Sequence, residues 1–169
     1  MRTKIFSSIV LCTLALYAPT CWATAASQEP TKTTPQYDAA LAQKLGADSR
    51  GMRSYVLVIL KSGPNKVAPG KERDEMFAGH FANMQALANA GKLVLAGPFD
   101  GKDGWRGLFV FAVTSIDEAR ELTNTDPVIM KGEMVAEYHQ WYGSAAVMEV
   151  SSIHARLTPP KAQAEANKK

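Results

Sequence analysis

The chain has 169 residues, which suits one domain with tails and leaves little room for two cores. Hydrophobic residues make up 46% and charged residues 21% of it, which excludes a fibrous or wholly disordered chain. The formal net charge is +3, but no cluster of Lys and Arg interleaved with aromatic residues is present, which argues against nucleic-acid binding.

Residues 1–25 have the pattern of a secretory signal peptide. Two basic residues precede an apolar run from Ile5 to Ala18, and Ala23-Thr24-Ala25 offers small residues for cleavage after Ala25. A membrane anchor is the alternative, but the run is shorter than the roughly 20 apolar residues that a bilayer requires. We therefore expect a periplasmic or secreted protein with no stable membrane insertion after cleavage. Cleavage would also remove both cysteines, so neither a disulfide nor thiol chemistry is expected in the mature chain.

Residues 26–52 are expected to form a flexible tether that contains a short helix. The segment 27–36 is rich in Thr, Pro and Gln and poor in large apolar residues. Tyr37, Leu41 and Leu45 then recur at a spacing of four, which gives a short helix one apolar face. Whether this helix packs on its own subunit or on a partner is left open by the sequence.

Residues 53–150 read as a folded core of alternating strands and helices. Apolar runs and turn residues predict strands at Arg53–Lys61, Lys92–Ala96, Trp105–Val113 and near Glu133–Tyr142, and helices at Asp74–Ala90 and after Thr114 or Ser115. Gly97-Pro98 is expected to stop the second strand, and Asp126-Pro127 to form a short turn. The order βαββαβ predicts an α+β, ferredoxin-like domain with a four-stranded antiparallel sheet. Residues 151–169 are expected to be a polar C-terminal tail.

Both faces of the predicted sheet are apolar. On the first strand, Tyr55, Leu57 and Ile59 point one way, while the alternating residues that point the other way are also apolar. Two helices cover only one face, so the second face must be buried against something else. A homodimer whose sheets face each other is the economical solution, with a ligand cavity between or beside them.

His80 and Asp126 are the candidate catalytic residues. His80 lies between Met76 and Met84 at a spacing of four, so it is expected on or beside the helix face that packs on the sheet. An imidazole in such surroundings is either a hydrogen-bonded core histidine or an acid/base catalyst. Asp126 precedes Pro127 and can be explained as a helix N-cap, but a capping aspartate can also orient a histidine ring.

The remaining histidines are weaker candidates. His139 alternates with Glu137 and Trp141 on the last strand, where His139 and Trp141 either line the same cavity as His80 or pack at a subunit interface. His154 lies beyond the core and is expected to be solvated. The three histidines show no tight ligand spacing, so no metal site is expected.

A longer pattern follows His80: GHFANMQALANAGKLVLAGPF, then a helix that opens with SIDEAR, then TDPVIMKGE. This stretch resembles the YciI-like (YCII-related) family, and the resemblance spans roughly Arg53 to Tyr142, in the element order predicted above. The following YHQWYGSAAVMEV resembles an exported subgroup of that family. Phe77-Ala78-Gly79 stands where many members have an Arg-Pro pair.

The resemblance implies a dimeric α+β barrel. It also implies that the histidine and aspartate thought to form the family's active-site dyad fall on His80 and Asp126. Gly97 and Pro98 match the family too and are implied to shape the cavity wall, so they join His139 and Trp141 as candidate substrate-binding residues.

Two classes of function remain. One is a cofactor-independent lyase or isomerase for a small molecule, in which His80 moves a proton next to a carbonyl or lactone and Asp126 orients it. The alternative is a non-catalytic dimeric module that binds a small ligand, with both residues structural. Haem binding with His80 as an axial ligand is a remoter idea.

Overall fold

The computed structural model describes residues 36–157 and residue 159, and all of these except Gln36 belong to one compact unit, Tyr37–Lys169. The predicted signal peptide and the tether up to residue 35 lie outside the described residues. So does the predicted tail from residue 160 onward, together with residue 158.

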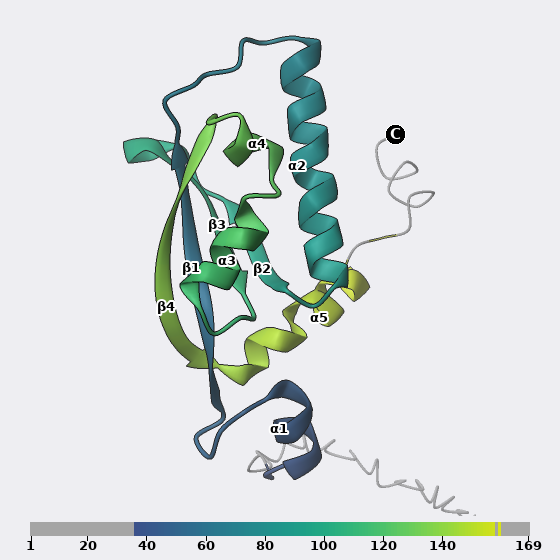
Figure 1. Cartoon of the computed structure of the whole chain (residues 1–169). Coiled ribbons are helices and arrows are strands. Elements are labelled where there is room, and N and C mark those ends of the chain that lie inside the picture. The colour runs from purple at the N-terminus through teal and green to yellow at the C-terminus, as the bar shows by residue number, and fades with distance from the viewer. Residues whose placement is uncertain (1–35, 158, 160–169) are drawn as a thin grey trace, which may run out of the picture. The chain divides into compact units, whose positions relative to one another are not determined.

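A four-stranded antiparallel sheet forms the centre of the fold, with the strand order β2-β3-β1-β4 (Figure 1). The strands are β1 (Met52–Ser62), β2 (Leu93–Pro98), β3 (Trp105–Phe111) and β4 (Met134–Ser144). Helix α2 (Lys71–Asn89) connects β1 to β2, and α3 (Ile116–Thr123) and the one-turn α4 (Pro127–Met130) connect β3 to β4. The predicted α+β class and βαββαβ order are thus confirmed.

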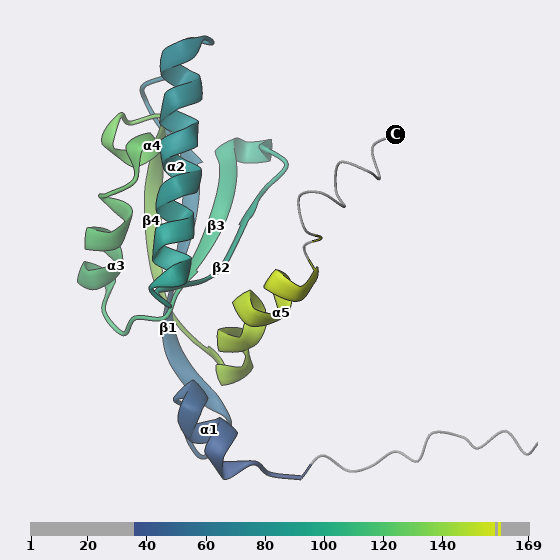
Figure 2. The same cartoon turned by 90° about the vertical axis from the view of Figure 1, so that its right-hand side faces the viewer.

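The helices α2, α3 and α4 bury one face of this sheet. Met76 of α2, Ala119 of α3 and Val128 of α4 belong to one core cluster with the strand residues Val58 and Phe109. Figure 2 shows α3 and α4 on one side of α2, where they contact β4, and the last helix, α5, on the other side, where it contacts β2. The sheet therefore has one face covered by helices, and α2 lies along it.

Several element boundaries differ from the sequence-based expectation. β2 does not stop at Gly97-Pro98 but continues through both residues, with Pro98 opposite Gly107 of β3. β2 is an edge strand, and an edge strand tolerates proline because one of its sides makes no ladder hydrogen bonds. α2 begins three residues earlier than expected, at Lys71. Ser115, rather than Thr114, caps α3 by accepting a hydrogen bond from the Glu118 N–H at 3.1 Å.

The second face of the sheet is covered in part by the chain's own C-terminal segment. The 3-10 helix η2 (Ala145–Glu149) follows β4, and its Val147 and Met148 pack against Tyr55, Val94 and Val110. A second copy is therefore not needed to bury this part of the face. The sequence pattern predicts that a second copy covers the second face, and residues beyond the last strand provide part of that cover.

The segment from residue 150 onward is helical before it leaves the described range. Residues 151–157, assigned above to the polar tail, belong to α5 (Val150–Leu157), and their side chains are exposed. Among the described residues, no helix is both long and apolar enough to cross a membrane.

The short helix expected at residues 37–45 is present as α1 (Ala39–Leu45). The Asp38 side chain caps its start by accepting from the Leu41 N–H, and Gly46 ends it with a φ of 66°, a conformation that glycine adopts without strain. Lys44 forms a 2.9 Å ion pair with Glu149 of η2, and Arg53 of β1 donates to the Leu45 carbonyl at 2.8 Å. α1 thus has contacts within its own chain.

Candidate functional site

His80 is one of only two residues of α2 that are buried, the other being Met76 one turn earlier. The helix packs a single stripe against the sheet, and the spacing of four between Met76 and His80 puts both on that stripe. His80 is 7% exposed, so its imidazole has exchanged most of its water contacts for protein contacts. A polar ring in that position needs a hydrogen-bond partner.

Asp126 supplies that partner from a turn 46 residues away. Its Oδ2 lies 2.7 Å from Nδ1 of His80, and Asp126 is 1% exposed. An ionised carboxylate can only accept a hydrogen bond, so Nδ1–H donates and the other ring nitrogen, Nε2, is left to act as a base. The candidate catalytic residues singled out in the sequence are thus in direct contact.

The capping role of Asp126 is present at the same time. Its second oxygen, Oδ1, accepts a hydrogen bond from the Val128 N–H at 3.1 Å, and Pro127 occupies the first turn of α4. One oxygen is held by the backbone of α4 while the other points at α2. The cap and the dyad are therefore not competing explanations, because the cap fixes the direction of the oxygen that reaches His80.

Close packing between α2 and α4 sets the spacing of this pair. Gly79 lies next to His80, and a Cβ at Gly79 would come within 2.9 Å of the Pro127 Cγ. Any larger residue would push α4, and with it Asp126, away from α2. The Phe77-Ala78-Gly79 sequence, which departs from the family pattern, thus contributes the one small residue that the α2–α4 contact requires.

Aromatic rings surround the imidazole. The ring centroids of Phe77, Phe81 and Phe109 lie 6.1, 5.3 and 6.1 Å from that of His80, and the Phe109 ring is nearly parallel to it. Such surroundings exclude most water and strengthen the Asp126 hydrogen bond. Among the described residues, the buried side-chain polar atoms without a hydrogen bond comprise only Arg53 Nε. Nε2 of His80 also has no hydrogen-bond partner among the described residues, yet it is not one of these buried atoms. It therefore keeps some access to solvent.

Glu133 forms a second buried polar site, which sequence reasoning missed. Its side chain accepts from Arg73 of α2 at 2.8 Å and from the Val67 N–H at 2.8 Å, and Arg106 Nη1 lies 3.7 Å away. Burial raises the pKa of the Glu133 carboxyl, but the Val67 and Arg73 hydrogen bonds and the charges of Arg73 and Arg106 outweigh burial and hold this pKa below its ordinary value. Sixty residues separate Arg73 from Glu133, and no local pattern joins them.

His139 and Trp141 are not brought to His80 within the chain. They lie opposite Leu57 and Tyr55 of β1, on the sheet face that points away from α2. His139 Nε2 contacts the Glu137 carboxylate at 2.8 Å. Alternate residues of a strand point to the same face of the sheet, so His139 and Trp141 share the face opposite to the one that His80 covers. Within a single subunit they therefore do not share a cavity with His80.

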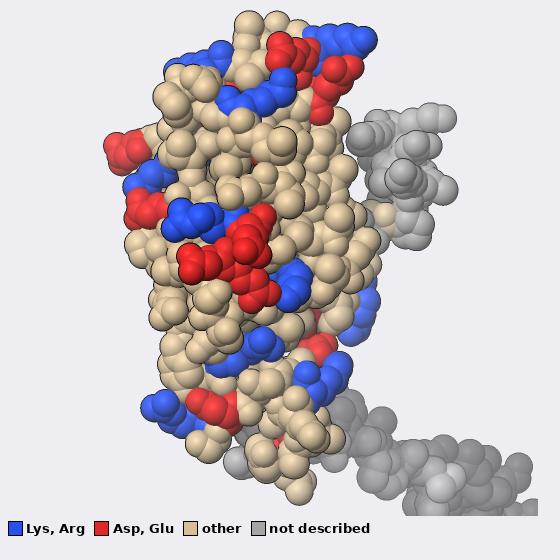
Figure 3. All heavy atoms as spheres, in the orientation of Figure 1, with Lys and Arg blue, Asp and Glu red and all other residues tan. Residues whose placement is uncertain are grey.

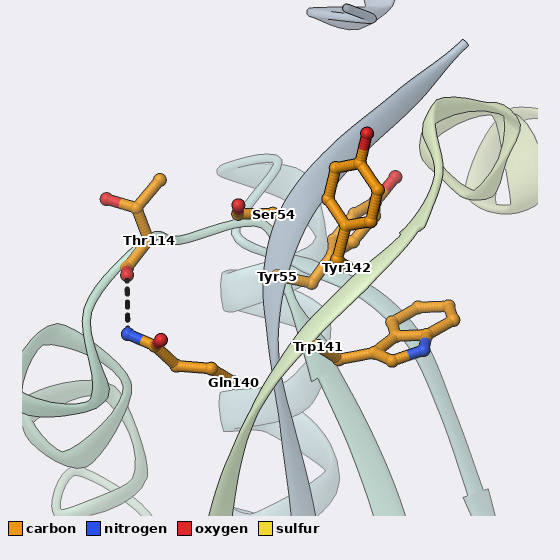
Figure 4. Close-up of a pocket in the computed structure, with 6 residues that line it drawn as sticks. All are labelled: Ser54, Tyr55, Thr114, Gln140, Trp141 and Tyr142. Carbon is orange, nitrogen blue, oxygen red and sulfur yellow. Dashed lines mark hydrogen bonds between the residues drawn. The ribbon is translucent and has the colours of Figure 1, made fainter. Parts of the chain in front are cut away.

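Trp141 instead borders a small hollow of about 150 Å³ near the end of β4. Figure 4 shows Trp141 and Tyr142 pointing to opposite sides of the strand, and Gln140 reaching the Thr114 carbonyl at 3.4 Å. The Trp141 ring lies 5.3 Å from that of Tyr55. Neither His80 nor Asp126 borders this hollow.

Gly97 and Pro98 lie on β2 one and two positions beyond Ala96, the residue paired with Phe109. The Phe109 ring lies 6.1 Å from the His80 ring, so these two strand residues follow a residue that pairs with an aromatic neighbour of His80. A contact between either residue and a ligand stays a prediction.

Other kinds of site find little support in the described part of the chain. No group of three or more His, Cys, Asp or Glu side chains there is arranged to hold a metal ion. Over the described residues of the face in Figure 3, basic and acidic side chains lie next to one another, and neither sign forms a continuous patch.

A model of the YCII-related domain matches residues 54–153, which is more than half of the sequence. The chain belongs to the YCII-related domain family. The resemblance expected from the residues around His80 is thereby confirmed at the level of the family. This YCII-related chain is also 30% identical over 71 residues to the uncharacterized protein YjpA of Bacillus subtilis (strain 168), covering 42% of this chain and 81% of YjpA.

Among solved structures, the chain is similar to 5-chloro-2-hydroxyhydroquinone dehydrochlorinase (TftG) from Burkholderia phenoliruptrix AC1100, in complex with 2,5-dihydroxybenzoquinone. The two sequences are 22% identical, the TM-score is 0.40, and the match covers 52% of this YCII-related chain and 92% of the other.

Proposed function

We propose that this YCII-related protein is an enzyme that moves a proton on a small carbonyl compound or lactone, as a lyase or isomerase, with His80 as acid/base and Asp126 as its orienting partner. The observation that carries the proposal is the 2.7 Å contact between His80 Nδ1 and Asp126 Oδ2, with aromatic rings next to the imidazole. An imidazole held in one tautomer by a buried carboxylate is the arrangement that general acid–base catalysis uses.

The proposed reaction begins at Nε2 of His80. This nitrogen takes a proton from the carbon next to the carbonyl, and the electron pair of the C–H bond becomes an enolate. In an isomerase the imidazolium returns the proton to a different carbon. In a lyase a leaving group on the neighbouring carbon departs with its bonding pair, a double bond forms, and the imidazolium proton passes to solvent. Asp126 stabilises the imidazolium in both cases.

Deuterium exchange tests the proposal without knowledge of the true substrate. The protein would be incubated in D2O with cyclohexanone, 2-cyclohexenone and γ-butyrolactone, and loss of the signals of the protons next to the carbonyl would be followed by NMR. We expect exchange above the buffer rate, and His80→Gln should reduce the enzymatic part by about a hundredfold or more.

His139→Gln is the matched control. His139 is also a histidine beside a carboxylate, but it lies on the opposite face of the sheet, so its loss should leave exchange unchanged. The proposed enzymatic activity would be contradicted if exchange were equal in wild type and His80→Gln, or absent with all three probes. A dyad that only stabilises the fold, as in a non-catalytic binding module, would give that outcome together with a lowered Tm.

We also propose that the protein is a homodimer that pairs the uncovered part of the second sheet face. Trp105, Val135 and Trp141 on that face are 42%, 44% and 37% exposed, although the neighbouring Ile59 is buried. These apolar side chains lie on either side of the Lys61–Glu137 ion pair of the same face, and exposed large apolar side chains favour association. Sedimentation equilibrium should give twice the chain mass, and Val135→Glu should shift the equilibrium toward monomer. A wild-type monomer at high concentration would contradict this.

Export remains our proposal for the N-terminal segment. The support is the order of basic start, apolar run and small residues in residues 1–25. Cell fractionation and the mass of the mature protein should show an exported chain that begins after Ala25. A full-length chain that stays in the cytosol would argue against export.

A further inference from the structure

A large groove lies between α2, β2 and α5, with a volume of about 640 Å³. Phe81, Met84 and Ala88 of α2 form one wall, Leu95 of β2 lies in the floor, and Ala155 of α5 belongs to the other wall. Figure 2 shows α2 and α5 on either side of the lower part of β2. The groove thus depends on the segment that sequence reasoning treated as a tail.

The lining of the groove is mostly apolar and contains no permanently charged side chain, that is, no Lys, Arg, Asp or Glu. Its polar members are the amides Gln85 and Asn89, the hydroxyl of Ser151 and the imidazole of His154. Gln85 and Asn89 already bond to each other at 2.9 Å. A charged ligand would lose its hydration here and meet no Lys, Arg, Asp or Glu to pair with, whereas a neutral ligand has less hydration to lose.

Large apolar side chains in the lining remain exposed. Phe81 is 63% exposed and Leu95 is 38% exposed, on neighbouring elements of the same groove. A ligand that covered both would remove apolar surface from water, which is the main driving force for binding neutral organic molecules. The volume lies within the roughly 300 to 1,000 Å³ typical of small-molecule sites.

One end of the groove is lined by Phe81, a direct ring neighbour of His80, although His80 itself does not line the groove. Phe81 lines the groove, and its ring centroid is 5.3 Å from that of His80. Ala96 also lines it, and its partner across the ladder is Phe109, whose ring lies 6.1 Å from His80 on the other side. Two separate elements, α2 and β2, therefore connect the same end of the groove to the imidazole.

We infer that this groove binds the substrate of His80, and that the substrate is a neutral molecule with one or two apolar rings. Its reacting carbonyl lies at the Phe81 end, and its rings extend over Met84 and Leu95 toward α5. The inference rests on the proposed function for the identity of the reacting group, but the binding site itself does not. α5 is thus a wall of the binding site.

Binding is measured with 2-naphthol, a neutral two-ring molecule that fluoresces, on the full mature chain. 2-Naphthoate, which has the same rings and a negative charge, is the matched ligand. In a protein labelled with [13C-methyl]-methionine, NMR reports whether the Met84 methyl signal shifts on binding. We expect 2-naphthol to bind, to shift Met84, and to bind at least about tenfold more tightly than 2-naphthoate.

Two substitutions fill the groove from different sides. Ala88→Phe adds a ring on α2 and Ala155→Phe adds one on α5, and each should weaken 2-naphthol binding by about tenfold or more. Ala86→Phe is the control, because Ala86 is an exposed alanine of α2 that does not line the groove. It should leave the affinity within about twofold, and circular dichroism checks that all three variants fold.

The outcomes separate this inference from the proposed function. His80→Ala should keep 2-naphthol binding while it loses deuterium exchange. If only the exchange assay failed, the inference that the groove binds a ligand would therefore be unaffected. Equal affinity of wild type, Ala88→Phe and Ala155→Phe would overturn the groove, and equal affinity for 2-naphthoate would overturn the neutral ligand class. If Ala88→Phe changed the oligomeric state but not the 2-naphthol affinity, the groove would be a contact between copies of the chain. That result would also overturn the inference that the groove binds substrate.

Discussion

Two buried carboxylates, Asp126 and Glu133, lie on the same side of the sheet and both contact α2, but their surroundings differ. They are 1% and 3% exposed. Asp126 meets the imidazole of His80. Glu133 meets Arg73 and Arg106, which stay charged.

The difference shows that burial of a carboxylate does not by itself mark an active site. Both oxygens of Glu133 have protein partners, the Arg73 guanidinium and the Val67 N–H, and no group there can exchange a proton with a ligand. At Asp126 the partner has a second nitrogen without a protein hydrogen bond. The Glu133 site holds the start of β4 and the loop before α2 together. The Asp126 site leaves one atom, Nε2 of His80, available for chemistry.

The largest effect that separates the two sites is expected from Asp126→Asn and Glu133→Gln, compared in the deuterium-exchange assay. Asparagine still caps α4 but does not stabilise the imidazolium, so exchange should fall by about a hundredfold to ten-thousandfold. Glu133→Gln should leave the exchange rate per folded molecule within about twofold, since Glu133 contacts no proton-exchanging group. Rates are measured at a temperature where both variants are fully folded.

The opposite result would remove the distinction. If Glu133→Gln lowered exchange as much as Asp126→Asn, both carboxylates would act on exchange through α2. The result would then give no evidence that Asp126 has a direct role in catalysis. A pH profile of exchange adds a second measure, because a purely structural role for Asp126 would lower the amount of folded protein without changing the profile's shape.

Much of the dyad could be predicted from the sequence, because each residue sits in a local pattern. Met76, His80 and Met84 repeat with the helical period, and Asp126-Pro127 has the form of a helix start. What the patterns do not contain is the 2.7 Å contact, which depends on how closely α4 packs on α2. The family resemblance joined the two residues where periodicity alone did not.

Other features were beyond local patterns. The alternation in β4 places His139 and Trp141 on one face together, but does not say which face α2 covers. Arg73 and Glu133 meet only after the sheet forms, and each reads as a solvated charge in the sequence. α5 was missed although Val150, Ile153 and Leu157 recur at helical spacing, because the segment is only eight residues long and is followed by a polar, proline-containing stretch.

The next largest effect is on stability. Glu133→Gln keeps the shape of the side chain but leaves Arg73 and Arg106 without their counter-charge, so the free energy of unfolding should fall by about 2 to 3 kcal/mol. Asp126→Asn should cost about 1 kcal/mol. Urea unfolding at neutral pH measures both, and a larger loss for Asp126→Asn than for Glu133→Gln would contradict the assignment of Glu133 as the structural site.

Acid should reduce the difference in the free energy of unfolding between wild type and Glu133→Gln. The pKa of Glu133 is held below its ordinary value in the folded chain, so its contribution to stability is fully present above the pKa of the unfolded chain and is lost as the pH falls through the folded pKa. Urea unfolding should therefore give the full difference near pH 7 and a smaller one at about pH 3.5, below the ordinary glutamate pKa. A difference that stays constant over this range would mean that the charge of Glu133 is not what stabilises the fold.

The smallest effect is expected from Gly79→Ala, which acts on the geometry of the dyad without changing either member. Alanine favours a helix by about 1 kcal/mol, but its Cβ would lie 2.9 Å from Pro127 Cγ, so α4 must shift away from α2. The two terms oppose each other, and we expect the free energy of unfolding to change by less than about 1 kcal/mol. Exchange should still fall by about threefold to tenfold, because Asp126 moves with Pro127 and its hydrogen bond to His80 lengthens. Ala78→Gly, on the exposed neighbour in the same turn, controls for helix propensity. A stable Gly79→Ala protein with undiminished exchange would show that the close α2–α4 contact is not needed to hold the carboxylate against the imidazole.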